Sequence, residues 1–77
     1  MIATHTIQDI SFDQNSIQLN IDGKIIKISL HKISSKLQSA NELQRNLYKI
    51  SPSGYGIHWP LIDEDLSVDA IIKIAGQ

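Results

Sequence analysis

The dipeptide Asp22-Gly23 constrains the fold of this 77-residue chain more than any other local feature, because alternating apolar residues flank it on both sides. Both of its positions tolerate positive φ, as a two-residue type I′ hairpin turn requires. A loop of two residues also sets the register of the strands, and the register agrees with the alternation, so the sequence predicts a β-hairpin. The expected cross-strand pairs are Ile21 with Lys24, Leu19 with Ile26 and Ile17 with Ile28 on one face, and Gln18 with Lys27 and Ser16 with Ser29 on the other.

An earlier strand is expected at about residues 6–12. Its Ile10 and Phe12 fall on one face, and its Ile7 falls on the other. The Asp-Gln-Asn segment at 13–15 is typical of a turn, and it returns this strand to the hairpin. The three strands together predict an antiparallel meander whose apolar face needs a cover of helices.

The clearest helix signal is the pair Asn41 and Gln44, which have the spacing of a capping box. Apolar residues then recur at helical spacing until Pro52 ends the helix. These residues are Leu43, Leu47 and Ile50. Residues 30–40 are ambiguous, and they are compatible with one helical turn in which Leu37 contributes to the core.

A last helix of about two turns is expected near the C-terminus, where packing must hold it because so short a helix is marginal alone. Ser67 is a good N-cap, and Asp69 favours the positive end of the helix dipole. One apolar stripe, with Ile74 beside it, precedes Gly76. The stripe consists of Val68, Ile71, Ile72 and Ala75.

The chemically richest stretch runs from Gly54 to Asp69 and holds the only Trp and three consecutive acids. Gly54 and Gly56 let the backbone turn closely before a short strand that Pro60 ends. Apolar side chains alternate around His58 in this strand, which directs them towards the core. The expected core residues of the stretch are Ile57, Trp59 and Leu66.

The sequence therefore predicts a single domain over residues 1–77 with an α+β fold. It consists of a three-stranded antiparallel meander plus a short fourth strand, packed against two or three short helices. A chain of this length buries roughly 60% of the surface that its unfolded form exposes, so its core alone gives marginal stability. Help from a second copy or from a partner is a natural expectation.

Composition argues against several classes of protein. The chain has seven Lys and Arg, eight Asp and Glu and a net charge of −1, so it lacks the clustered cations that neutralise phosphates, and nucleic acid binding by this chain alone is not expected. It has no Cys for disulfides or thiolate metal sites. No apolar run approaches the length of a membrane span, and the N-terminus lacks the features of a signal peptide. We expect no membrane contact and a cytoplasmic location.

The acids Asp63, Glu64 and Asp65 are the first place to look for metal binding or catalysis. In extended backbone, Asp63 and Asp65 point the same way, so two carboxylates could approach one cation. A hard-metal site normally draws ligands from more than one segment, and no other acid cluster is available. We therefore favour acids that cap the final helix, charge the surface and pair with Arg45, and we expect no metal or cofactor.

The single Arg and the three His complete the candidate residues. Arg45 lies at the boundary of the apolar stripe of its helix, from which it is expected to reach the acid triplet in a structural ion pair. His58 beside the Trp could act as an acid or base, but no nucleophile accompanies it, so a structural or surface histidine is favoured. His5 and His31 have no spacing that makes either a metal partner for it.

Residues 56–68, together with the Asp-Gly hairpin and the Leu-Gln-Arg of 43–45, resemble the domain-of-unknown-function family 2442 over about residues 7–74. Many members continue from the hairpin with Pro-Leu and then Phe-Pro-Arg-Leu. This chain has Ser29-Leu30 and the segment 33–37 there, so those Pro residues and that extra Arg are missing.

The resemblance implies a compact α+β fold of three strands followed by helices, in a bacterial protein. Short members often occur beside a second small protein of unknown-function family 4160, an arrangement that resembles a toxin–antitoxin pair with this domain as the presumed antitoxin. Other members carry an additional helix-turn-helix domain and look like regulators.

The favoured hypothesis is a non-enzymatic protein-binding module, the antitoxin-like component of such a pair, which masks a small partner protein encoded nearby. A homodimer is a further expectation. Two alternatives stay open: a regulatory domain that contributes to DNA binding, and an uncharacterised enzyme. In the favoured hypothesis, the residues that bind the partner or form the ion pair are Arg45, His58, Asp63, Glu64 and Asp65.

Overall fold

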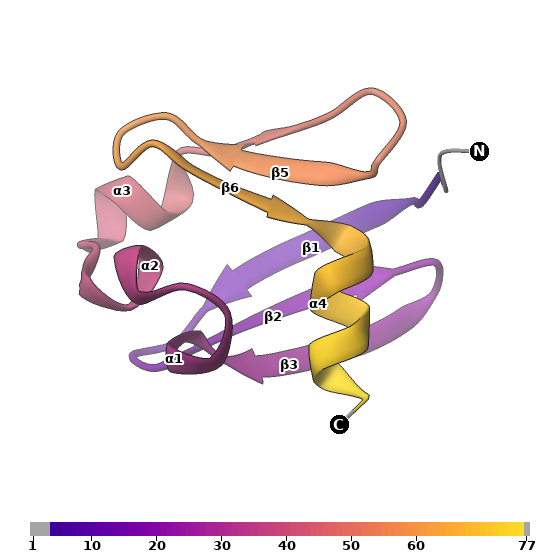
Figure 1. The fold of residues 1–77 in the computed structure, drawn as a ribbon, viewed down its shortest axis with the longest axis horizontal. Helices are drawn as coiled ribbons and strands as arrows, with labels where there is room; N and C mark the ends of the chain where they lie inside the picture. Colours follow the sequence, from indigo (N-terminus) through magenta and orange to yellow (C-terminus); the bar gives the residue numbers. More distant parts are fainter. Residues whose placement is uncertain (1–3, 77) are drawn as a thin grey trace.

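The structure, a computed structural model, describes residues 4–76 and consists of two small three-stranded antiparallel sheets with short helices around them (Figure 1). The first sheet has the order β1-β2-β3 and consists of β1 (Ile7–Phe12), β2 (Ser16–Ile21) and β3 (Lys24–Ser29). The second has the order β4-β5-β6 and consists of β4 (Lys49–Ile50), β5 (Gly56–Trp59) and β6 (Glu64–Ser67).

Three helices connect the sheets, namely α1 (Leu30–Ile33), α2 (Ser35–Ser39) and α3 (Glu42–Asn46), and a fourth, α4 (Val68–Ala75), follows β6. Figure 1 shows the sheets one above the other, with α1 to α3 at one end and α4 across the other. The predicted α+β class is confirmed. The predicted fourth strand corresponds to β5, but it does not stand alone, because β4 and β6 flank it and complete a second sheet.

The predicted hairpin is confirmed in its turn and in its register. Asp22 and Gly23 have φ of 53° and 87°, the positive values that the turn requires. All five predicted cross-strand pairs between β2 and β3 are present. Local turn chemistry and alternation of apolar residues agree at this site, and that agreement explains why the sequence alone was sufficient.

A β-bulge in β1 corrects the expected orientation of Ile7. The register shifts between Gln8 and Ser11, so that Asp9 and Ile10 together lie opposite one residue of β2. Asp9 has a φ of 55° and absorbs the extra residue. The extra residue of the bulge reverses the side-chain alternation of the strand. Ile7 therefore packs against the core together with Ile10 instead of facing away.

The turn between β1 and β2 is held by the carboxylate of Asp13. Its Oδ1 accepts hydrogen bonds from the backbone N–H of Asn15 at 3.0 Å and from the N–H and hydroxyl of Ser16, both at 2.7 Å. Its Oδ2 lies 3.2 Å from Nζ of Lys27. These donors, above all the Ser16 hydroxyl, hold the pKa of Asp13 well below its usual range. The predicted turn at 13–15 is confirmed.

The core lies between the two sheets and is closed by helices at both ends. Trp59 is fully buried; Phe12 and Tyr48 lie against its ring, with centroids 6.5 and 6.3 Å away, and its Nε1 donates to the carbonyl of Arg45 at 2.9 Å. Leu66 is half-buried and packs on the cluster. The predicted core positions Ile57, Trp59 and Leu66 are thus confirmed. The buried residues are Ile17, Leu19, Ile21, Ile28, Leu30, Leu37, Ile57, Trp59, Val68 and Ile71.

The capping box of α3 is confirmed, but the predicted length of this helix is wrong. The helix ends at Asn46, and the chain continues in extended form into β4, which pairs with β5. Leu43 and Leu47 are 67% and 44% exposed, because Arg45 occupies the inward side of the helix. The apolar spacing that predicted a buried stripe therefore marks an exposed one.

The last helix agrees with the prediction in its bounds and N-cap but not in all of its predicted apolar stripe, since Ala75 is exposed. The Ser67 hydroxyl accepts from the backbone N–H of Ala70, which confirms the N-cap. Val68 and Ile71 are buried as predicted. Ile74, expected beside the stripe, packs against the core, whereas the predicted core residue Ile72 is 36% exposed.

Candidate functional site

The three consecutive acids diverge and form no common site. Asp63 ends the β5–β6 turn with a φ of 51°, so it does not lie in extended backbone beside Asp65. Glu64 accepts a hydrogen bond from the hydroxyl of Ser34, which is 6% exposed. None of the three caps α4, because Ser67 does. Among residues 4–76, no group of three or more His, Asp or Glu side chains is placed to hold a metal ion.

Arg45 makes no ion pair with these acids, so the predicted ion pair is wrong. Its guanidinium instead donates to four backbone carbonyls at 3.0 to 3.2 Å and lies 5.9 Å from the centre of the Phe12 ring. The carbonyls at the end of α2 lack partners within that helix, and a planar fork of donors suits them. Arg45 thus fastens α2 to the β1–β2 turn. The four acceptors are the carbonyls of Asp13, Gln14, Leu37 and Gln38.

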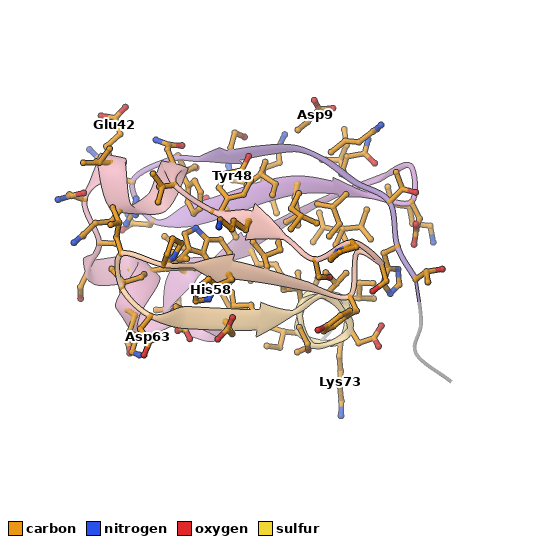
Figure 2. All side chains as sticks on the ribbon, turned by 90° about the horizontal axis from the view of Figure 1, so that it is seen from above. Asp9, Glu42, Tyr48, His58, Asp63 and Lys73 are labelled. Carbon is orange, nitrogen blue, oxygen red and sulfur yellow. The ribbon has the colours of Figure 1, made fainter. Side chains whose placement is uncertain are left out.

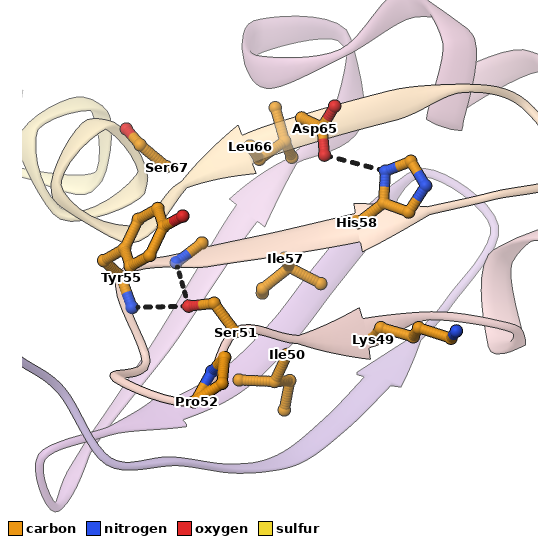
Figure 3. A pocket seen from close by; sticks show the side chains of 11 residues that line it. Lys49, Ile50, Ser51, Pro52, Tyr55, Ile57, His58, Asp65, Leu66 and Ser67 are labelled. Atoms are coloured by element: carbon orange, nitrogen blue, oxygen red, sulfur yellow. Dashed lines mark hydrogen bonds and ion pairs between the residues drawn. The ribbon is translucent and has the colours of Figure 1, made fainter.

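The outer face of the second sheet carries a row of polar side chains across its three strands. Lys49 on β4 pairs with His58 on β5, which pairs with Asp65 on β6. Because Ile57 and Trp59 alternate with His58 and are buried, the row faces solvent. Nδ1 of His58 lies 2.7 Å from Oδ1 of Asp65, and the two side chains are 39% and 76% exposed (Figure 3).

A hollow of about 530 Å³ lies beside this polar row (Figure 3). Gly56 forms part of its lining and has no side chain to fill it, and Tyr55 and Pro52 also line it. The hydroxyl of Ser51 accepts from the backbone N–H of Tyr55 at 3.0 Å and of Gly56 at 3.2 Å, which fixes the loop. Tyr55 is 51% exposed, so its ring remains available to another molecule.

Exposed apolar side chains concentrate in the same part of the chain. Seven large hydrophobic side chains are exposed among the described residues, and five of them lie between residues 43 and 61. These five are Leu43, Leu47, Ile50, Tyr55 and Leu61. The other two, Ile25 and Ile72, lie on β3 and α4. Scattered apolar residues on a surface are ordinary, and of these five Ile50 and Tyr55 both line the hollow.

His5 bridges two carboxylates, a role that sequence reasoning missed. Its Nδ1 lies 2.7 Å from Oδ2 of Asp22 in the hairpin turn, and its Nε2 lies 3.0 Å from Oδ1 of Asp69 in α4. The hydrogen bonds to Asp22 and then to Asp69 raise the pKa of His5. The bond from His5, with one from the N–H of Thr6, lowers the pKa of Asp22. Separations of 17 and 64 residues leave no local sequence pattern that could have revealed this bridge.

No helix within residues 4–76 is long and apolar enough to cross a membrane. In comparison with known proteins, the family model described as "Protein of unknown function (DUF2442)" matches residues 7–77, nearly the whole chain. No curated protein and no solved structure matches the chain.

Proposed function

The chain belongs to the DUF2442 family, a family of unknown function, and we propose that it is a non-enzymatic protein-binding module, the antitoxin-like component of a bacterial two-protein pair. Its partner is a small protein encoded nearby. The binding surface is the outer face of the second sheet, which consists of the polar row Lys49–His58–Asp65, the adjoining hollow and the ring of Tyr55. We call this set the outer face.

The exposure of Tyr55 beside an unfilled hollow is the observation that carries the proposal. Aromatic side chains are enriched among the residues that dominate binding energy, since a rigid ring offers a large contact area. Tyr55 is 51% exposed and Ile50 is 38% exposed, and both contribute to the lining of the hollow. A partner side chain that enters the hollow would contact the Tyr55 ring and exclude water from both.

The polar row supplies direction rather than most of the affinity. Exposed ion pairs contribute roughly 0–1 kcal/mol each, so Lys49 and Asp65 alone cannot hold a partner. Opposite charges at the two ends of the row favour a partner with the complementary order and oppose the reverse orientation. This division, with apolar contacts for affinity and charges for register, is usual in protein interfaces.

To test the proposal, the tagged chain is co-expressed with the product of the adjacent gene, and the affinity of the purified complex is measured. Tyr55→Ser is expected to weaken binding by about 30-fold, the equivalent of about 2 kcal/mol for a dominant interface residue. Ile25→Ser is the matched control, because Ile25 is 70% exposed on the other sheet. This control is expected to leave the affinity unchanged.

Two results would overturn the proposal. The first is the absence of any complex between the wild-type chain and the adjacent gene product. The second is a Tyr55→Ser variant that binds as tightly as wild type while its circular dichroism spectrum is unchanged. Equal weakening by Ile25→Ser would place the contact on the other sheet and would contradict the assigned surface.

A further inference from the structure

We infer that the outer face also binds a second copy of this chain, so that two molecules pair face to face around a two-fold axis. The inference rests on the proposed function, since it takes the same face as a protein-binding surface. It goes further by naming an occupant that needs no other gene product.

The order of charges along the polar row is the first reason. Lys49 and Asp65 lie at opposite ends of the row, two strand spacings or about 10 Å apart, with His58 between them. A two-fold axis that runs along β5 above His58 places each Lys49 opposite the partner's Asp65. Both ends of the row are then matched at once, as a self-complementary dimer interface requires.

The same charges exclude the other simple two-fold arrangement. An axis that runs across the strands, along the row, would place Lys49 opposite the partner's Lys49 and Asp65 opposite the partner's Asp65. Two pairs of like charges would then meet at the interface and repel one another. The charge order therefore selects one mutual orientation of the two sheets.

The apolar part of the face is self-complementary under the same axis. The hollow beside Gly56 then faces the hollow of the second copy, and Tyr55 of each molecule lies at the shared opening. Two half-exposed rings can enter this joint space, which removes them and the apolar lining from water. The charges set the register, and the rings supply the buried area.

The size of the face is adequate for a dimer. The side of the molecule that carries the outer face measures 33 by 19 Å between Cα atoms, along the longest and shortest axes of the molecule, and Figure 2 shows it in plan. A stable interface buries about 800 Å² on each partner. That is about one sixth of the 4993 Å² of exposed surface of this chain. A single face of a small molecule can supply such an area.

The test is a charge exchange followed by sedimentation analysis of the purified full chain. Lys49→Glu is expected to be a monomer, because the introduced carboxylate would face the partner's Asp65, and Asp65→Lys is expected to be a monomer for the mirror reason. An equimolar mixture of the two variants is expected to form a dimer, since both contacts between the unlike copies are then attractive. Wild type is expected to sediment with twice the chain mass.

Lys24→Glu is the control, because it makes the same charge change in the hairpin of the other sheet; it is expected to remain a dimer. Wild type that remains a monomer at millimolar concentration would overturn the inference. So would single variants that stay dimeric, or a mixture that stays monomeric while both variants retain the wild-type circular dichroism spectrum. Binding of the adjacent gene product is measured separately, so failure of self-pairing leaves the proposed function standing.

Discussion

Gly54 lies directly against the backbone carbonyl of His5: a Cβ atom on Gly54 would sit 1.8 Å from the His5 oxygen. The N–H of His5 also donates to the carbonyl of Ser53 at 3.1 Å. The segment that precedes β1 is thereby fastened to the loop that precedes β5, and the two sheets are joined at this end. The loop that carries Tyr55 begins at this contact, so the position of the candidate binding surface depends on it.

Gly54→Ala is expected to cost about 3 kcal/mol or more, most of the stability of a domain whose core supplies about 3–5 kcal/mol. Its φ of 71° strains any other residue, and the clash is with backbone that cannot turn aside. Gly23→Ala is the control, because Gly23 has a φ of 87° but nothing within 4 Å of the added atom. It should cost only about 1–2 kcal/mol. Urea unfolding measures both, and equal losses would contradict the importance of the contact with His5.

The bridge of His5 makes stability depend on pH. Because its pKa is raised above the 6.5 of the unfolded chain, its contribution is complete below that value and is lost as pH rises through the folded pKa. Asp22 behaves oppositely: its pKa is lowered from 3.8, so its contribution is present above that value and is lost as pH falls through the folded pKa. The bridge therefore stabilises the fold most between these two limits.

His5→Gln is accordingly expected to lower the melting temperature at about pH 5.5 much more than at about pH 9. The measurement is the difference in melting temperature between wild type and variant at each pH. His31→Gln, an exposed position on α1, is the control and should give no such difference. A His5→Gln loss that is the same at both pH values would show that the ring acts only through packing.

Arg45 is expected to matter through its fork of donors. Arg45→Ala should reduce the free energy of unfolding by about 1.5–3 kcal/mol, because the guanidinium bonds to four carbonyls. Arg45→Lys should lose at least half as much, since one ammonium cannot reach both α2 and the β1–β2 turn. Thermal unfolding followed by fluorescence of the single Trp measures both. A Lys variant as stable as wild type would indicate that charge alone suffices.

The parts of the fold that the sequence predicted correctly are those fixed by neighbouring residues. The hairpin at Asp22, the capping box at Asn41 and the N-cap at Ser67 each depend on residues within a few positions, and all three are present. Side-chain alternation was likewise sufficient to place Ile57 and Trp59 in the core. Local propensity and tertiary packing agree at these positions, so either one predicts the other.

The errors arose where distant residues decide. Leu43 and Leu47 have helical spacing, but the hydrogen bonds of Arg45 to carbonyls of α2 and of the β1–β2 turn direct the other side of α3 inwards. The bulge at Asp9 follows from its left-handed backbone, which alternation alone does not reveal. At the candidate site, the His58–Asp65 pair could be predicted only if β6 was recognised as a strand that pairs with β5. The three consecutive acids were interpreted as surface charges and helix caps instead.

The central claim, that the outer face of the second sheet binds another protein, is tested most directly by mapping the contact on the chain itself. The measurement is a titration of the isotopically labelled chain with the adjacent gene product, followed by nuclear magnetic resonance of the backbone amides. We predict shifts or broadening at Tyr55, Gly56, His58 and Asp65, and none at Ile25. Changes centred on Ile25 and the solvent-facing side of the first sheet, or no changes at a saturating concentration of the partner, would contradict the claim.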